Sequence, residues 1–414
     1  MEAPLIKKAW KKDTKTLAIV YPNLYYGGVY CLAPLIIYNQ VNNISNWICE
    51  RQFLDKHEDL SKFNLVGFTF QYELDLYNIQ DLIKKYKPKI TFAGGPCVNQ
   101  NPESLKGIDF FILGEAEEIL QKVLEKYTEN KEEFLKSIAN FQGVYVPKYS
   151  KKITYTTADL EKAPYPLYQP LPQKLTKQFV FGASFMLEIE RGCPGLCKFC
   201  SLGHMHKKPR YRSLESLKRI IDKGIKLNKR NKIVIYSPSF THPDKKEILR
   251  YIISKGLRFS VPSIKVEHID KETLEIIKQG GQKTLTIAPE ANEKIRRSIG
   301  KFVTDEQFIN FVKLAKQLDF KAIKAYFMIG LPNQEEADLK ETIRFINKLK
   351  SELKNIHISI NAFVPKLGTP FEKYAFNKKQ IKQQANYLKK NLKNIKYKLS
   401  NIESSYKEYK LANN

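Results

Sequence analysis

The chain has 414 residues, of which 43% are hydrophobic and 12% aromatic, and its formal net charge is +27. This size and composition fit a folded protein of two domains, each with its own core, and exclude an intrinsically disordered chain. No apolar stretch approaches the ~18 residues of a membrane-spanning helix, and no apolar segment of a signal peptide follows the N-terminal lysines. Six cysteines, half of them in one loop, are typical of a reducing compartment, so we expect a cytoplasmic protein.

Strand-like and helix-like segments alternate in the first part of the chain. Strands are expected at residues 17–21, 47–53, 65–70, 89–95 and 110–114, and helices at 32–42, 75–86 and 115–127. This alternation predicts an α/β domain over residues 1–142, with a doubly wound and mostly parallel sheet. Ligands of such sheets bind beyond the carboxyl ends of the strands, where Gly94 and Gly95 form a turn. A tight strand–helix turn needs glycine with or without a ligand.

Residues 143–180 are rich in proline and are expected to form an extended linker. A second alternation occupies residues 181–375. Strands are expected at residues 185–190, 232–236, 258–266, 283–288, 322–329 and 356–363, and helices at 213–226, 242–254, 270–279, 305–318 and 335–353. Six strand–helix pairs predict a partial (βα)6 barrel with its site at the carboxyl ends of the strands. Residues 376–414 are expected to form a basic C-terminal helix.

The positive charge is unevenly distributed. Residues 1–150 contain 18 basic and 18 acidic residues, so the whole excess lies in the rest of the chain. Residues 207–232 hold eleven Lys or Arg, and residues 377–399 hold eight lysines and no acidic residue. If these two segments lie on one side, they form a track for the phosphates of a polyanion such as RNA. Lysine bias of the whole sequence and solvated, lysine-covered helices are the alternatives.

Three cysteines, Cys193, Cys197 and Cys200, lie within eight residues, directly after the first strand of the second alternation. Thiolates so close on one loop can share a metal centre, and three of them leave one position of a four-iron cluster open for chemistry. The other cysteines are scattered, which disfavours disulfides. A structural zinc site with His204 or His206 as the fourth ligand is an alternative, and cysteines that only pack are another.

The spacing C-x3-C-x2-C at the end of a first barrel strand resembles the signature of the radical SAM superfamily. The resemblance covers about residues 181–370. It implies that the three cysteines hold a [4Fe-4S] cluster, whose open iron binds the amino and carboxylate groups of S-adenosylmethionine (SAM). It also implies reductive cleavage of SAM to methionine and a 5′-deoxyadenosyl radical, with an electron from a donor such as flavodoxin or ferredoxin.

Some SAM-binding positions follow from this resemblance. Phe199 corresponds to the usual aromatic residue beside the adenine, although a packing role is equally consistent with the sequence. The Gly-Gly-Glu that the family usually has at the second strand is replaced by Tyr236-Ser-Pro-Ser239. Ser237 or Ser239, or backbone carbonyl groups, would therefore have to bind the SAM amino group.

Further positions come from later strands. Glu290 is expected to accept a hydrogen bond from a ribose hydroxyl or the amino group of SAM. Arg296 and Arg297 are expected either to pair with the SAM carboxylate or to be solvated helix residues. Gly330 resembles the family's adenine-binding strand end, where glycine lets the backbone approach the base.

Residues 1–142 resemble the cobalamin-binding-type domain that precedes many radical SAM barrels. The resemblance rests on Gly94-Gly95-Pro96, on the acidic stretch 114–118 and on the order of the elements. The Asp-x-His-x-x-Gly motif that supplies a histidine to cobalt is absent, and residues 1–56 contain no histidine. The domain is therefore expected either to bind cobalamin or to be a retained scaffold without it.

Two functions of different classes follow. The first is a radical SAM enzyme that methylates or methylthiolates RNA, or a protein associated with RNA. Methylthiolation is the weaker variant, because the cysteines of the first domain, Cys31, Cys49 and Cys97, are scattered and are not the three that would hold a second cluster. The second function is a non-catalytic RNA-binding protein with a structural zinc or a relic cluster.

Overall fold

The computed structural model describes most of the chain. The described ranges are 13–205, 208–392 and 395–413. They form two compact units, of which the first takes the described residues up to Ala183 together with Asp222–Lys229. The second takes Ser184–Ile221 and the described residues from Arg230 onward. No helix in these ranges is both long and apolar enough to cross a membrane.

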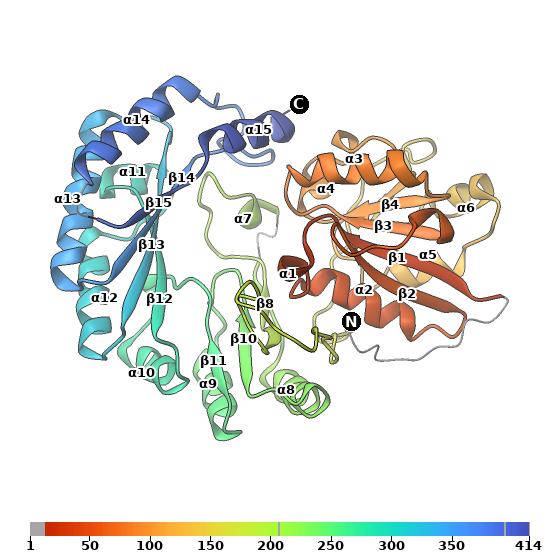
Figure 1. The fold of residues 1–414 in the computed structure, drawn as a ribbon, viewed down its shortest axis with the longest axis horizontal. Coiled ribbons are helices and arrows are strands. Elements are labelled where there is room, and N and C mark those ends of the chain that lie inside the picture. The colour runs from red at the N-terminus through yellow and green to blue at the C-terminus, as the bar shows by residue number, and fades with distance from the viewer. Residues whose placement is uncertain (1–12, 206–207, 393–394, 414) are drawn as a thin grey trace. The chain divides into compact units, whose positions relative to one another are not determined.

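The first unit is the predicted doubly wound sheet, in the strand order β2-β1-β3-β4-β5-β6 (Figure 1). The first five strands are parallel, and β6 is antiparallel to β5. The strands are β1 (Lys15–Tyr21), β2 (Trp47–Phe53), β3 (Leu65–Thr69), β4 (Thr91–Gly94), β5 (Phe110–Ile112) and β6 (Val144–Tyr145). The helices are α1 (Tyr25–Gly28), α2 (Leu32–Asn42), η1 (Leu60–Lys62), α3 (Asp75–Tyr86), α4 (Pro96–Gln100), η2 (Pro102–Ser104), α5 (Leu120–Glu125) and α6 (Lys131–Ile138).

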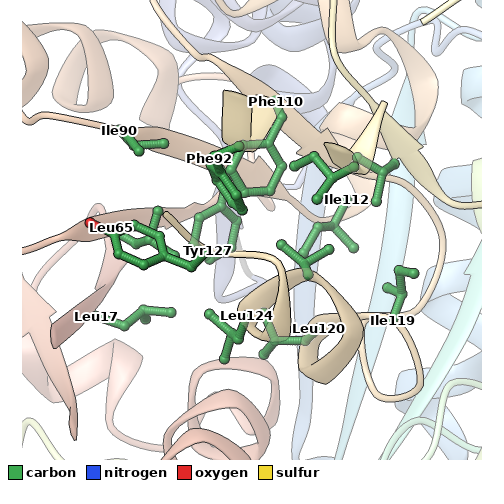
Figure 2. Close-up of a cluster of buried hydrophobic side chains, with 14 of the residues drawn as sticks. Leu17, Leu65, Ile90, Phe92, Phe110, Ile112, Ile119, Leu120, Leu124 and Tyr127 are labelled. Carbon is green, nitrogen blue, oxygen red and sulfur yellow. The ribbon is translucent and has the colours of Figure 1, made fainter. Parts of the chain in front are cut away.

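One face of this sheet packs on α2, α5 and α6. Leu17 and Leu65 of the strands lie in one cluster with Leu120 and Leu124 of α5 (Figure 2). Every second side chain of a strand lies in this cluster, because successive side chains of a strand point to opposite sides of the sheet. Burial of each large apolar side chain contributes about 1.5–3 kcal/mol, so this cluster is a main source of the unit's stability.

The glycine turn at the end of β5 is occupied by the chain's own backbone. Gly114 has a φ of +87° and pairs with Thr156, whose N–H donates to Leu113 O and whose carbonyl accepts from the N–H of Glu115, both at 3.1 Å. A Cβ on Gly114 would lie 2.1 Å from Thr156 O. Because Glu115 is held in this pairing, the helix predicted from residue 115 begins only at Leu120.

Gly114→Ala is expected to lower the free energy of unfolding of the first unit by about 2 kcal/mol or more. The alanine would adopt a left-handed backbone and displace the backbone at Thr156. Fluorescence of Trp47, which is buried in this unit, reports the transition in urea. Gly27→Ala is the control, because a Cβ there meets nothing within 4 Å. Equal stabilities of the two variants would contradict the packing of residue 156 on this turn.

The second unit confirms the predicted barrel and adds a strand to it. Its two parallel sheets have the orders β11-β10-β7 and β12-β13-β14-β15, so in the described residues the strands follow one another in chain order. The N–H of Ile264, after β11, donates to Thr286 O of β12 at 2.8 Å and links the two sheets. The barrel strands are β7 (Phe185–Glu188), β10 (Lys232–Tyr236), β11 (Arg258–Ser260), β12 (Thr284–Glu290), β13 (Ala322–Ile329), β14 (Ile356–Ala362) and β15 (Tyr397–Leu399).

Helices join these strands, and one more helix follows the last of them (Figure 1). They are α8 (Leu214–Asn228), α9 (Lys245–Ser254), η3 (Val266–His268), α10 (Lys271–Gln279), α11 (Glu293–Ser298), α12 (Asp305–Gln317), α13 (Glu336–Glu352), α14 (Lys378–Asn391) and α15 (Ile402–Asn413). The strand predicted to end at residue 266 ends at Ser260, shortly before Pro262, which has no N–H for a strand ladder.

The prediction of one basic C-terminal helix is wrong. Strand β15 separates α14 from α15 and pairs with β14, which supplies the backbone hydrogen bonds that a longer helix would have made internally. Lys378 and Lys382 of α14 form ion pairs with Glu403 of α15, at 2.6 and 3.1 Å. Lys393 lies outside the described residues.

The basic track over residues 207–232 and 377–399 stays a prediction. Helix α8 follows the first barrel strand and α14 precedes the last, so the two segments belong to opposite ends of the strand order. Arg212, one of the eleven basic residues near α8, is buried against Glu188. The exposed basic residues of α8 are Arg219, Lys223 and Lys226.

Candidate functional site

The three clustered cysteines lie on one loop at the carboxyl end of the first barrel strand. The loop leaves β8 (Glu190–Arg191) and returns in β9 (Arg210–Tyr211), which pairs antiparallel with β8. It contains one short helix, α7 (Ser201–Met205). Cys193, Cys197 and Cys200 are free and partly exposed thiols. The sequence correctly predicted the location of this loop.

Tight backbone packing closes the cysteine loop. The N–H of Gly195 lies 3.4 Å from Cys193 Sγ, and the N–H of Cys200 donates to Cys197 O at 3.0 Å. A Cβ on Gly203 would lie 2.1 Å from Gly195 O, so this crossing requires glycine. Loop closure therefore depends on Gly203, which follows the last cysteine and crosses the backbone at Gly195.

Burial favours the neutral form of two of the loop's thiols, Cys197 and Cys200, when no metal is bound. Burial raises the pKa of Cys197, an effect that the charges of Lys301 and Lys265 oppose. Burial also raises the pKa of Cys200. Iron would bind these sulfurs as thiolates and release their protons. Three soft sulfur donors on one partly buried loop fit an iron–sulfur cluster.

A histidine ligand in the loop would be needed for the zinc alternative. His204 Nε2 lies 3.2 Å from Cys197 O, so this ring nitrogen already has a backbone partner. His206 lies outside the described residues. Within the described ranges, no three His, Cys, Asp or Glu side chains are grouped closely enough for a single metal ion. A four-iron cluster binds each thiolate through a different iron and therefore accepts more widely spaced sulfurs.

Strained backbone marks the carboxyl ends of several barrel strands. Phe240, Glu290 and Asn333, after or at the ends of β10, β12 and β13, have φ values of +51°, +67° and +59°. A left-handed backbone costs a non-glycine residue about 1–2 kcal/mol, and such strain clusters at functional sites. These residues place the candidate site at the edge where barrel enzymes bind their ligands.

Glu290 lies at this edge and is buried. Burial raises the pKa of its carboxyl group, and the nearby ammonium group of Lys301 opposes that effect. Lys301 Nζ lies 3.2 Å from Glu290 Oε1 and also donates to Ala288 O. The position of Glu290 near the cysteine loop is compatible with the predicted role in SAM binding, which stays a prediction.

Ser237 and Ser239 are buried, and their hydroxyl groups donate to a carboxylate of the protein. Both bond to Glu190 Oε1, at 3.0 Å for Ser239, and the N–H of Thr241 donates to the same carboxylate at 3.1 Å. The sequence analysis missed Glu190. Two glutamates at alternate positions of an apolar strand, 188 and 190, were the available signal. The two serines thus join the first and second strand ends, and a direct SAM contact stays a prediction.

The cysteine loop begins at a buried ion-pair cluster that the sequence analysis also missed. Arg191 donates to both carboxylate oxygens of Glu188, from Nε at 2.8 Å and from Nη2 at 3.0 Å. Arg212 Nη2 donates to Glu188 Oε2 at 3.2 Å. Glu188 therefore connects the residues on both sides of the loop and fixes where the loop leaves the barrel.

Arg296 is bonded within the protein, and its pairing with the SAM carboxylate stays a prediction. Its side chain is 0% exposed and donates to the carbonyl groups of Pro289, Val303 and Ala291 and to Asp305 Oδ1, at 2.7–2.8 Å. With four N–H groups used in this way, the guanidinium group holds α11 on the barrel. Arg297 is the solvated alternative, since its side chain is half exposed and pairs with Glu293 at 2.9 Å.

The remaining predicted positions are also in close contact with other parts of the protein. Phe199 packs on an apolar cluster that includes Ile295 and Leu331. Gly330 has a φ of +78°, and a Cβ there would lie 2.6 Å from the side chain of Ile381. At the first sheet, a Cβ on Gly95 would lie 2.7 Å from Phe70 O.

A group of polar side chains follows the carboxyl ends of the neighbouring strands β1 and β3. The order 2-1-3-4-5 of the parallel strands places a topological switch point here, where open α/β sheets bind ligands. Asn23 Nδ2 donates to Asp75 Oδ1 at 2.9 Å, and Gln71 Nε2 lies 3.0 Å from Cys31 Sγ. Burial, with the charges of Cys31 and Asp75, raises the pKa of Tyr21 to about 12.

Asp75 makes the stability of the first unit depend on pH. Burial raises the pKa of its carboxyl group to about 6 from an ordinary value of 3.8. The folded state therefore favours the protonated form, and about 2–3 kcal/mol of stability, present below pH ~4, is lost as the pH rises through ~6. Asp75→Asn should remove this dependence in urea unfolding followed by Trp47 fluorescence. Asp81→Asn, exposed on the same helix, should retain it.

Comparisons with known proteins define the class. Residues 187–346 match the family model described as the radical SAM superfamily, and residues 54–147 match the model for the N-terminal region of radical SAM proteins. The uncharacterized protein MJ0966 of Methanocaldococcus jannaschii is 33% identical over 400 residues, which cover 93% of this chain and 86% of that protein. The chain belongs to the radical SAM superfamily.

Two further similarities are informative. The uncharacterized methyltransferase PH0819 of Pyrococcus horikoshii is 28% identical over 346 residues, which cover 78% of this chain and 72% of the relative. The apo structure of the cobalamin-dependent S-adenosylmethionine radical enzyme OxsB has a TM-score of 0.57 at 16% identity and covers 80% of this chain. The chain spans 52% of that longer protein, and this likeness concerns the fold alone.

Proposed function

We propose that this protein is a radical SAM enzyme in which Cys193, Cys197 and Cys200 hold a [4Fe-4S] cluster with one iron open to SAM. The observation that carries the proposal is the presence of three partly buried free thiols on one loop, at the carboxyl end of the first barrel strand. When bound, the cluster and SAM supply reductive cleavage of the sulfonium and a 5′-deoxyadenosyl radical.

The chain's own residues position these groups. Glu188, with its two arginines, fixes where the cysteine loop leaves the barrel, and Glu190 joins the first strand end to the second. Glu290, held by Lys301, offers a carboxylate beside the loop as an acceptor for SAM. The apolar cluster beneath Phe199 keeps water away from this side of the site.

Methyl transfer is the reaction that we propose. The name of the Pyrococcus horikoshii relative and the cobalamin dependence of OxsB support it. The polar group at the switch point of the first sheet is where we place cobalamin, if the first unit binds it. Methylthiolation is the alternative, supported by the name of the putative methylthiotransferase MJ0865 of Methanocaldococcus jannaschii, 25% identical over 370 residues. We place it second because Cys49 lies in the apolar core of the first unit, where burial raises its pKa.

The proposed substrate is RNA or an RNA-associated protein, since the net charge of +27 lies wholly after residue 150. The affinity for a single-stranded RNA should fall with salt, with a slope of log K against log salt of about −2 or steeper. Replacing Arg219, Lys223 and Lys226 together by Gln should reduce that slope by about 2, measured by fluorescence anisotropy. A flat salt response of the unchanged protein would remove RNA as the substrate.

The enzymatic proposal is tested by anaerobic reconstitution with iron and sulfide, followed by SAM and dithionite. Formation of 5′-deoxyadenosine and methionine is the expected result. A protein that purifies with stoichiometric zinc and forms neither product would support the non-catalytic alternative.

A further inference from the structure

A lysine from another part of the barrel lies beside the cysteine loop. Lys265 follows β11 and precedes η3. A Cβ built on Gly195 would lie 2.7 Å from Lys265 Nζ and 3.5 Å from Cys193 Sγ. The ammonium group and the sulfur therefore lie on either side of the same point. A side chain at position 195 would displace the ammonium group from its position.

Lys265 carries a charge for which the described part of the chain provides no ion-pair partner. Among the described residues, no carboxylate forms an ion pair with it. Lys301, the other lysine at the loop, lies 3.2 Å from Glu290 Oε1 and is compensated by that carboxylate. Lys265 is also partly buried, so water and salt screen its charge less than that of a surface lysine. An uncompensated cation in such a place indicates that its partner is an anionic group that the loop holds.

We propose that Lys265 raises the reduction potential of the iron–sulfur cluster and thereby makes its one-electron reduction easier. The inference rests on the proposed function, which places the cluster on Cys193, Cys197 and Cys200. One added electron makes the cluster and its three thiolates more negative by one charge. A fixed positive charge beside Cys193 therefore stabilises the reduced form more than the oxidised form. The electron comes from an external low-potential donor, and Lys265 exchanges neither an electron nor a proton.

The test is a redox titration of the reconstituted full-length protein, followed by electron paramagnetic resonance in the absence of SAM. At the wild-type midpoint potential, Lys265→Gln should lower the ratio of reduced to oxidised cluster about tenfold, a shift of about 59 mV to more negative potential. Lys265→Arg keeps the charge and should stay near the wild type. Lys198→Gln, an exposed lysine of the same loop, is the matched control and should change the ratio less than about twofold.

The outcomes separate this inference from the proposed function. An unchanged midpoint potential in Lys265→Gln overturns the inference, as does a shift that Lys265→Arg reproduces in full. A variant with unchanged potential but weaker SAM binding would make Lys265 a SAM ligand, which also overturns the inference. A wild-type protein that assembles no cluster removes the proposed function itself.

Discussion

Cys197→Ser is expected to abolish formation of 5′-deoxyadenosine from SAM and to leave the protein without a stable cluster. Only three thiolates are available on the loop, so each loss removes one of the bonds that hold the iron. Loss of an outer-shell partner of a metal already costs up to about 100-fold in affinity or activity, and loss of a direct ligand should exceed that. The measurements are iron and sulfide content after anaerobic reconstitution, the visible absorption of the cluster, and product formation with dithionite.

The control is a cysteine outside the loop. Cys97 is buried at the start of α4 in the first unit and has no place in the proposed cluster. Cys97→Ala should keep the iron content and the cleavage activity of the wild type. Retention of a full cluster in Cys197→Ser, or its loss in Cys97→Ala, would contradict the assignment of the loop as the ligand set.

Local sequence patterns predicted the elements whose limits depend on local chemistry. Helices α2 and α3 have the predicted limits, because α2 is a local apolar run and α3 has a local apolar periodicity. Helix α5 begins late because Glu115 pairs with a segment some 40 residues further along the chain. Strand β15 was missed for a similar reason, since its lysine-rich sequence has no strand pattern and its pairing with β14 defines it.

For the candidate site, too, the sequence predicted the local part and not the contacts between distant segments. The cysteine spacing is local and places the loop, but the groups around it come from other strand ends. Glu190 meets residues of the second strand end, and Lys265 reaches Gly195 from the third. The glycines show the limit most clearly. Gly95, Gly114 and Gly330 look in sequence like places where a ligand approaches the backbone, yet the protein's own atoms already fill the space beside each of them.

The buried ion-pair cluster at the base of the loop gives the second large expected effect. Glu188 is 7% exposed and holds Arg191 and Arg212, whose side chains are 15% and 1% exposed. Glu188→Gln removes the negative charge that faces the buried Arg212 and the largely buried Arg191. Removing one partner of a buried ion pair typically lowers the free energy of unfolding by about 3–5 kcal/mol. Replacing the whole pair by well-packed apolar side chains costs far less.

Urea unfolding followed by circular dichroism should show this loss in the transition of the second unit. Glu215→Gln is the matched control, because Glu215 is 72% exposed and pairs with Lys218 at the surface, where an ion pair contributes at most about 1 kcal/mol.

A double-mutant cycle separates the ion pair from general damage to the core. Arg212→Met replaces the buried cation by an apolar side chain of similar length, so combined with Glu188→Gln it removes both charges of this pair. The double variant should therefore be more stable than the sum of the single losses predicts, by about 1–3 kcal/mol. Strict additivity would show that Glu188 and Arg212 act independently.

Because Arg191 is two residues before Cys193, the Glu188→Gln variant should also bind iron less tightly after reconstitution, and the double variant should not recover that binding.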